Sequence, residues 1–187
     1  MKNIIFAGLL FIATMCSSCG NNEPDSKKEA VAENNEKFDS TAIKDDAKFA
    51  VAAADGGMME VQLGKLALTN SSAPIVKNFA QMMIDDHSMA GEELKTLAKT
   101  KNITLPDALS NKNQDAYNDL AKKKGKEFDK AYTSFMVKDH KEDIDEFKKQ
   151  GQNGNDKDLK NWAWGKVPIL EHHLMMAQKA DSVAWKK

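Results

Sequence analysis

Four long segments of this chain carry apolar residues at offsets of three, four and seven positions. They span approximately residues 45–70, 71–101, 127–150 and 156–185. Residues at these offsets lie on one side of an α-helix, whereas the two-residue alternation typical of a half-buried strand is nearly absent. The pattern therefore predicts an all-α domain with four long helices.

The joins between these segments are short, which favours an antiparallel four-helix bundle. Residues 111–124 are expected to add a short helix. Gly56-Gly57 is expected to kink the first long helix or to allow close packing. Gly165 and Pro168 are expected to break or kink the last one.

Each of the four apolar stripes includes one side chain that can bind a metal: Glu60, His87, His140 and His173. Burying a titratable group is costly unless it is paired or bound. Because four helices would each direct one such group toward the same core, we expect a buried polar site there.

One interpretation is a metal site with one glutamate and three histidines. Imidazole and carboxylate ligands suit one divalent ion of zinc, iron, manganese or copper. Met83, Met136 and Met176 lie one turn from the histidines, and thioethers favour copper, although these residues can equally be core packing. Asp86 and Asp139, which precede two of the histidines, are expected to serve at most as outer partners across helix interfaces.

The alternative is a hydrogen-bonded network of the same four residues without a metal, which would fix the register of the helices. A di-iron oxidase is disfavoured because Glu-x-x-His does not occur in the chain. No catalytic triad and no glycine-rich phosphate loop is present either, so no catalytic residues are assigned. An enzyme is less favoured than a binding or structural module.

The N-terminal residues have the features of an export signal. Lys2 is followed by an apolar run over residues 4–13, which is too short to span a bilayer. Ser18-Cys19 is typical of a lipoprotein cleavage site, so we predict a signal peptide over 1–18 and lipidation of Cys19 rather than Cys16. Residues 19–44 are polar and are expected to be a disordered tether, with the bundle domain over 45–187. No cysteine would remain in that domain, which excludes a cysteine-ligated zinc site.

The 27 basic residues balance 28 acidic ones, and all 27 are lysines. Arginine is the usual residue for bidentate contacts to phosphate and guanine. Its absence, and the lack of a concentrated basic patch, argue against nucleic acid as a partner. The expected partner is a membrane, reached through the lipid anchor.

Five stretches are similar to a known family: GMMEVQLGKLA (57–67), DHSMA (86–90), FDKAY (128–132), MVKDH (136–140) and VPILEHHL (167–174). In this order they resemble a bacterial family of unknown function, domain-of-unknown-function family 4142, often labelled "predicted outer membrane protein". The resemblance covers roughly residues 45–183. It implies export and a ferritin-like helical bundle, and it implies no established activity. His173, rather than His172, matches the family's pattern, and Val167 replaces its usual leucine.

Together these features predict a lipid-anchored protein of the cell envelope, at the outer membrane and facing the periplasm or the surface. The activity is not identified from the sequence; the leading role is that of a binding or structural module whose bundle core offers ligands for a metal ion. The alternatives are a metal-dependent redox or stress-protection protein and a metal-free structural or interaction module of the envelope.

Overall fold

The computed structural model describes residues 25–186, which form six helices and no strand. The helices are α1 (Ser26–Lys37), α2 (Lys44–Asn70), α3 (Pro74–Thr100), α4 (Asn111–Ala121), α5 (Gly125–Asn153) and α6 (Lys157–Ala184). The all-α prediction is confirmed. The predicted signal peptide and the predicted lipidation site at Cys19 lie outside the described residues.

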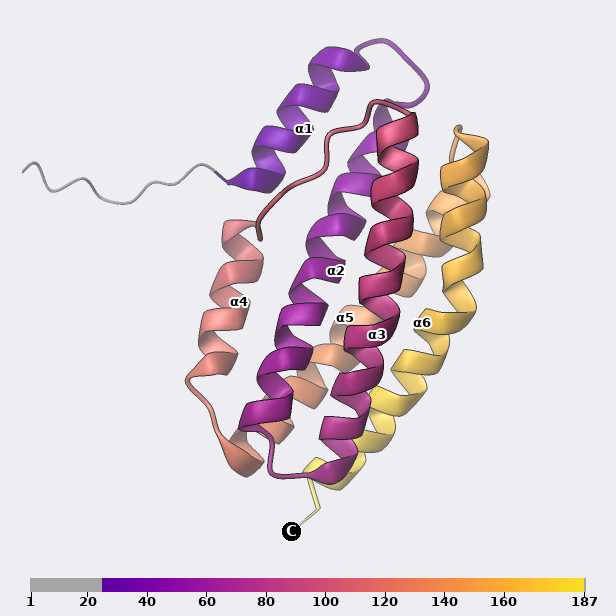
Figure 1. Cartoon of the computed structure of the whole chain (residues 1–187). Coiled ribbons are helices and arrows are strands. Elements are labelled where there is room, and N and C mark those ends of the chain that lie inside the picture. Colours follow the sequence, from indigo (N-terminus) through magenta and orange to yellow (C-terminus); the bar gives the residue numbers. More distant parts are fainter. Residues whose placement is uncertain (1–24, 187) are drawn as a thin grey trace, which may run out of the picture.

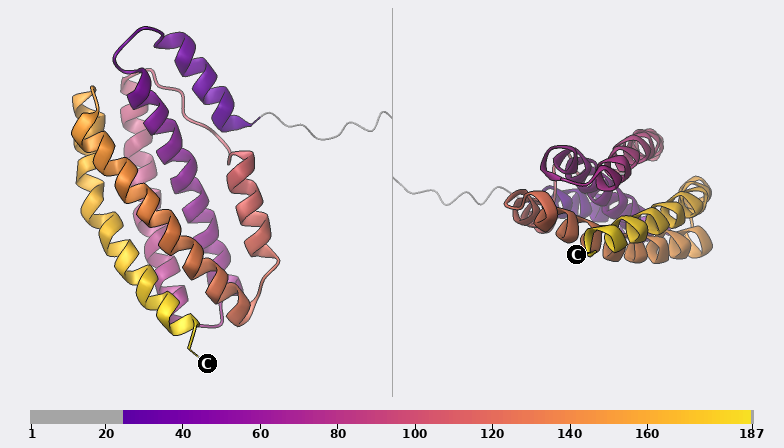
Figure 2. Two further views of the ribbon diagram at one scale, coloured as in Figure 1. Left: turned by 180° about the vertical axis from the view of Figure 1, so that it is seen from behind. Right: turned by 90° about the horizontal axis from the view of Figure 1, so that it is seen from below.

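The four long helices form two pairs, with α2 against α3 and α5 against α6. The members of each pair run in opposite directions (Figure 1), since only a short turn joins them. Contacts of α3 with α6 and of α2 with α5 bring the pairs together. The short helices α1 and α4 both lie along α2, on the side away from α6 (Figures 1 and 2).

Residues 26–37 differ from the expected disordered tether, because they form α1. Asn34 anchors this helix: its side-chain amide donates to the carbonyl of Thr104 over 2.7 Å and accepts from the Thr104 N–H over 2.8 Å. Only Ala30 and Asn34 are buried in α1. The helix is therefore held mainly by polar contacts, which leave no apolar stripe in the sequence.

The predicted break in the last helix does not occur, since α6 continues through Gly165 and Pro168. Gly56 and Gly57 also lie inside a continuous α2, and a Cβ on either would meet nothing within 4 Å. The close approach of α2 to α3 is at Gly64, where a Cβ would lie 2.8 Å from Cγ1 of Ile84. No helix in residues 25–186 combines the length and hydropathy needed to cross a bilayer.

The apolar core is divided into two clusters. The larger contains Met83 of α3 and Ala177 of α6, and the smaller contains Leu94 of α3 and Leu159 of α6. On both helices a histidine lies between the two clusters in sequence. The interruption of the core therefore marks the place where polar side chains enter it.

Candidate metal centre

Glu60, His87, His140 and His173 come together in this interruption, one from each of α2, α3, α5 and α6. Their side chains are almost completely shielded, with exposed fractions of 1%, 9%, 0% and 1%. The centroids of the three imidazole rings are 5.1 to 5.8 Å apart. The apolar stripes explain this convergence, because each group occupies the core-facing side of its helix.

One ring nitrogen of each histidine lies within hydrogen-bonding distance of an acceptor atom of the protein. Nδ1 of His140 lies 3.1 Å from the carbonyl oxygen of Met136. Nδ1 of His87 lies 2.8 Å from Oε2 of Glu60, and Nε2 of His173 lies 2.8 Å from Oδ2 of Asp86. A carbonyl oxygen can only accept a hydrogen bond. Nδ1 of His140 therefore carries the ring proton, and Nε2 has a free lone pair.

The other nitrogen of each ring has no hydrogen-bond partner among the described protein atoms. These nitrogens are Nε2 of His87, Nε2 of His140 and Nδ1 of His173. One ring nitrogen from each histidine lies within 4.8 Å of the other two. Two nitrogens on one tetrahedral zinc ion are about 3.4 Å apart, since each Zn–N bond is about 2.0–2.1 Å. Small side-chain movements would therefore let the three imidazoles share an ion.

The outer contacts are those that metal-binding histidines usually make. A ligating imidazole commonly donates its second N–H to a carboxylate or a backbone carbonyl, which fixes its tautomer and orientation. Here Glu60, Asp86 and the Met136 carbonyl occupy these positions. Asp86 reaches His173 from the neighbouring helix, in the outer role that the sequence allowed for it.

The structure divides the predicted set of four ligands into two overlapping triads. The first triad is His87, His140 and His173, and the second is Glu60, Asp139 and His140, whose ligand atoms also lie within 4.8 Å of one another. Glu60 is thus not part of the three-histidine triad. Asp139 was expected only as an outer partner, yet it belongs to the second triad. Its spacing of four residues from Asp143 places two acids on one side of α5, and this is the sequence signal that would have identified it.

Burial governs the titration of these groups, because it disfavours the charged form. It lowers the pKa of His87 to about 4 and that of His140 to about 3. It raises the pKa of Glu60 well above its usual range. Burial, together with the nearby Glu60 carboxylate, raises the pKa of Asp139 to about 8. At neutral pH the histidines are therefore neutral, which is the form that binds metals.

A cleft of about 650 Å³ leads from the surface to the histidine cluster, and His87 is one of the residues that line it. Its walls come from α2, α3 and the segment after α3, together with Phe147 of α5 and Trp162 of α6. Gly57 and Gly91 line it too, and a Cβ at either position would meet nothing within 4 Å. The cleft supplies a route by which a small ion or molecule can approach the cluster.

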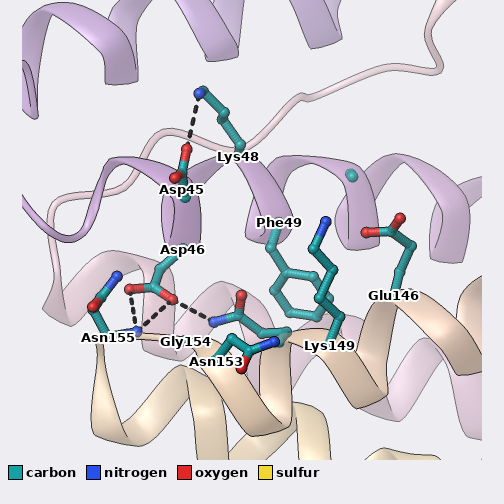
Figure 3. A pocket seen from close by; sticks show the side chains of 11 residues that line it. Asp45, Asp46, Lys48, Phe49, Glu146, Lys149, Asn153, Gly154 and Asn155 are labelled. Atoms are coloured by element: carbon teal, nitrogen blue, oxygen red, sulfur yellow. Dashed lines mark hydrogen bonds and ion pairs between the residues drawn. The ribbon is translucent and has the colours of Figure 1, made fainter.

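A second cleft, of about 520 Å³, lies between the start of α2 and the end of α5 (Figure 3). Its buried acid, Asp46, accepts from the backbone N–H of Asn155 over 3.0 Å, from that of Asp156 over 2.8 Å and from the amide of Gln150. These contacts join α2 to the end of α5 and to the turn before α6. The cleft therefore lies beside a structural contact. Both carboxylate oxygens of Asp46 already accept hydrogen bonds from the protein, so neither is available to a ligand.

Comparison with known proteins gives one match. A family model described as "Domain of unknown function (DUF4142)" matches residues 31–180. The match begins inside α1, in agreement with a fold that starts before residue 45. No curated protein and no solved structure matches the chain. The chain therefore belongs to the family of the domain of unknown function DUF4142.

Proposed function

We propose that this domain binds one divalent transition-metal ion through the three-histidine triad, in the core of a ferritin-like antiparallel four-helix bundle. The bundle comprises α2, α3, α5 and α6, with α1 and α4 as additions along α2. A lipid on Cys19 holds the domain at the cell envelope, with the outer membrane as the favoured location.

The three unpartnered imidazole nitrogens carry this proposal. Buried polar groups in proteins are nearly always hydrogen-bonded, and each exception needs an explanation. Here three exceptions occur in one cluster, on Nε2 of His87, Nε2 of His140 and Nδ1 of His173. A metal-free network would need hydrogen-bond donors for these nitrogens, but the outer contacts favour placing the ring N–H groups elsewhere. A protonated Glu60 would lie opposite Nε2 of His140, at 3.5 Å, and would leave the other two nitrogens without a donor.

Three neutral imidazoles favour zinc or copper over the harder cations, and they leave further coordination positions open. An ion held in this way can act as a Lewis acid or, for copper or iron, in electron transfer. The residues of this chain would supply orientation: Asp86 and the Met136 carbonyl fix two rings, and Glu60 faces the third. The cleft beside His87 would admit the ion.

The test is metal binding by the purified full chain, prepared without affinity-tag histidines. Zinc is expected to bind at about one ion per chain and to stabilise the fold by about 2.7 kcal/mol at a concentration of one hundred times Kd. The substitutions His140→Ala and His173→Ala should abolish that stabilisation. His172→Ala is the matched control, because His172 is exposed on the same helix as His173. If zinc changes neither the melting temperature nor the unfolding midpoint, the three-histidine triad does not bind zinc and this proposal fails.

The proposed anchor is tested separately. Cys19→Ser should leave the protein unprocessed or release it from the membrane fraction, whereas Cys16→Ser should leave anchoring intact. The opposite pattern would assign the lipid to Cys16.

A further inference from the structure

The second triad contains ligand atoms that the three-histidine position does not use. Oε1 of Glu60 and Oδ2 of Asp139 are buried and lack a hydrogen-bond partner among the described protein atoms, as does Nε2 of His140. Oε1 of Glu60 lies 3.5 Å from Nε2 of His140. Two ligand atoms on one ion are commonly about 3 Å apart, since oxygen and nitrogen each bind at about 2.0–2.2 Å.

Carboxylates crowd this side of the cluster, where the charge of Lys112 acts on Asp139 without forming an ion pair with it. No lysine in residues 25–186 forms an ion pair with Glu60 or Asp139. Asp143 lies one helical turn beyond Asp139, on the same side of α5. Carboxylates brought together in a protein core repel one another unless protons or a cation intervene. A divalent cation is the ligand that this arrangement fits.

His140 belongs to both triads but can serve only one ion at a time. Its Nδ1 faces the carbonyl of Met136, so Nε2 provides its only available lone pair. The two triads also differ in chemistry: the first offers three nitrogens, whereas the second offers two carboxylates and one nitrogen. Imidazole-rich sets suit copper and zinc, while carboxylate-rich sets suit the harder manganese ion.

We propose that Glu60, Asp139 and His140 form a second, carboxylate-rich position for a hard divalent cation such as Mn²⁺, and that it excludes an ion at the three-histidine position. The chain would then hold one ion, at a position determined by the kind of metal supplied. This inference extends the proposed metal binding, since both positions use His140.

The experiment measures Mn²⁺ alone and Zn²⁺ alone on the full chain, by isothermal titration and, for Mn²⁺, by the loss of the free-ion paramagnetic resonance signal. Each metal should bind at about one ion per chain, and zinc should displace manganese. Asp139→Asn should weaken Mn²⁺ binding at least about tenfold and leave Zn²⁺ within about threefold. His173→Gln should do the reverse. Asp145→Asn, an exposed acid on the same helix, is the matched control.

Three results would overturn the inference: simultaneous binding of both metals, no Mn²⁺ binding, or equal loss of Mn²⁺ in the Asp139→Asn and His173→Gln variants. The last would mean that both metals use one position. Failure of the proposed function looks different, because Zn²⁺ would then not bind while Mn²⁺ binding still depended on Asp139. Circular dichroism of each variant shows whether the helices are intact, so a lost fold is recognised separately from a lost ligand.

Discussion

Buried carboxylates occur in two kinds of environment in this molecule. Asp46 and Asp55 of α2 are 1% exposed, and each accepts a backbone N–H at the start of another helix, α6 for Asp46 and α4 for Asp55. Asp55 accepts from the N–H of Ser110 over 2.8 Å and from its hydroxyl over 2.9 Å, and it pairs with Lys27 at 3.1 Å. In the cluster with the three histidines, Glu60 is equally buried, but its Oε1 has no hydrogen-bond donor among the described residues.

The difference separates structural acids from candidate ligands. A carboxylate that accepts from backbone N–H groups is stabilised by the fold and in turn stabilises it. A carboxylate beside unpartnered imidazole nitrogens adds little to the metal-free fold and is available to a cation. Burial alone would not distinguish Asp46 from Glu60, whereas the count of donors does.

The largest expected effect is on the structural acid. Asp46→Asn would place an amide NH₂ group or a weaker acceptor against the N–H groups of Asn155 and Asp156, which now donate to the carboxylate. We expect the free energy of unfolding in urea to fall by about 3 kcal/mol. Asp45→Asn is the control, because its side chain is exposed and forms a surface ion pair with Lys48, and it should cost less than about 0.5 kcal/mol. Equal costs for the two variants would contradict this account of Asp46.

The second effect concerns the packing that holds α3, and with it His87, against α2. In Gly64→Ala the new Cβ would lie 2.8 Å from Cγ1 of Ile84 and 3.0 Å from the Ala80 carbonyl oxygen. The backbone oxygen cannot rotate away, so we expect a loss of about 2 kcal/mol in thermal or urea unfolding.

Gly56→Ala, on the same helix, provides the control for this packing. It has open space around its Cβ position and should gain about 0.5–1 kcal/mol from helix propensity. A stabilising Gly64→Ala would show that the two helices are not in close contact there.

These glycines also show what the sequence can and cannot predict. The long helices were predicted within a few residues of their observed ends, because their apolar stripes are continuous. Which glycine makes the close contact depends on where α3 crosses α2, and the periodicity of one helix does not contain that information. Similarly, α1 was missed because its contacts are polar and it has almost no buried apolar residue.

The same limit applies to the candidate site. The four residues on the stripes do meet, as one stripe per helix implies. The role of Asp139 was underestimated because adjacent side chains on a helix diverge by about 100°. A helix interface is wider than one stripe, however, and Glu60 approaches α5 on the side where Asp139 lies. Such a position depends on the spatial arrangement of α2 and α5.

The third effect is a pH dependence of the metal-free protein that comes from the middle of the molecule. Burial raises the pKa of Asp139 from its ordinary value of 3.8 to about 8 in the fold. Between these values the folded state holds a proton that the unfolded state has released, so raising the pH favours unfolding. Stability should therefore fall as the pH rises from 6.5 to 8, by at most about 1.4 kcal/mol per pH unit for one proton.

Below pH 6.5 the histidines oppose this trend, because the pKa values of His87 and His140 are lowered to about 4 and about 3. The unfolded state then binds protons that the folded state does not, and stability falls as the pH decreases through that range. The window from 6.5 to 8 thus isolates the acids. The slope of the urea midpoints across this window should become smaller in Asp139→Asn and stay unchanged in Asp145→Asn, since Glu60 and Asp143 also have raised pKa values. An unchanged slope in Asp139→Asn would assign the whole effect to those other acids.

The smallest expected effect completes the comparison with Asp46. Glu60→Gln is the same change of acid to amide at an equally buried position. No backbone N–H donates to the side-chain carboxylate of Glu60 within the described chain, and the new NH₂ group would face Nε2 of His140, an acceptor without a donor. The metal-free protein should therefore change its unfolding free energy by less than about 1 kcal/mol, since one unsatisfied acceptor gains a partner. The same variant should lose Mn²⁺ binding, because an amide is a poorer ligand than a carboxylate for a hard cation. A destabilisation as large as that of Asp46→Asn would show that Glu60 is a structural acid after all, and the distinction drawn from the number of donors would then fail.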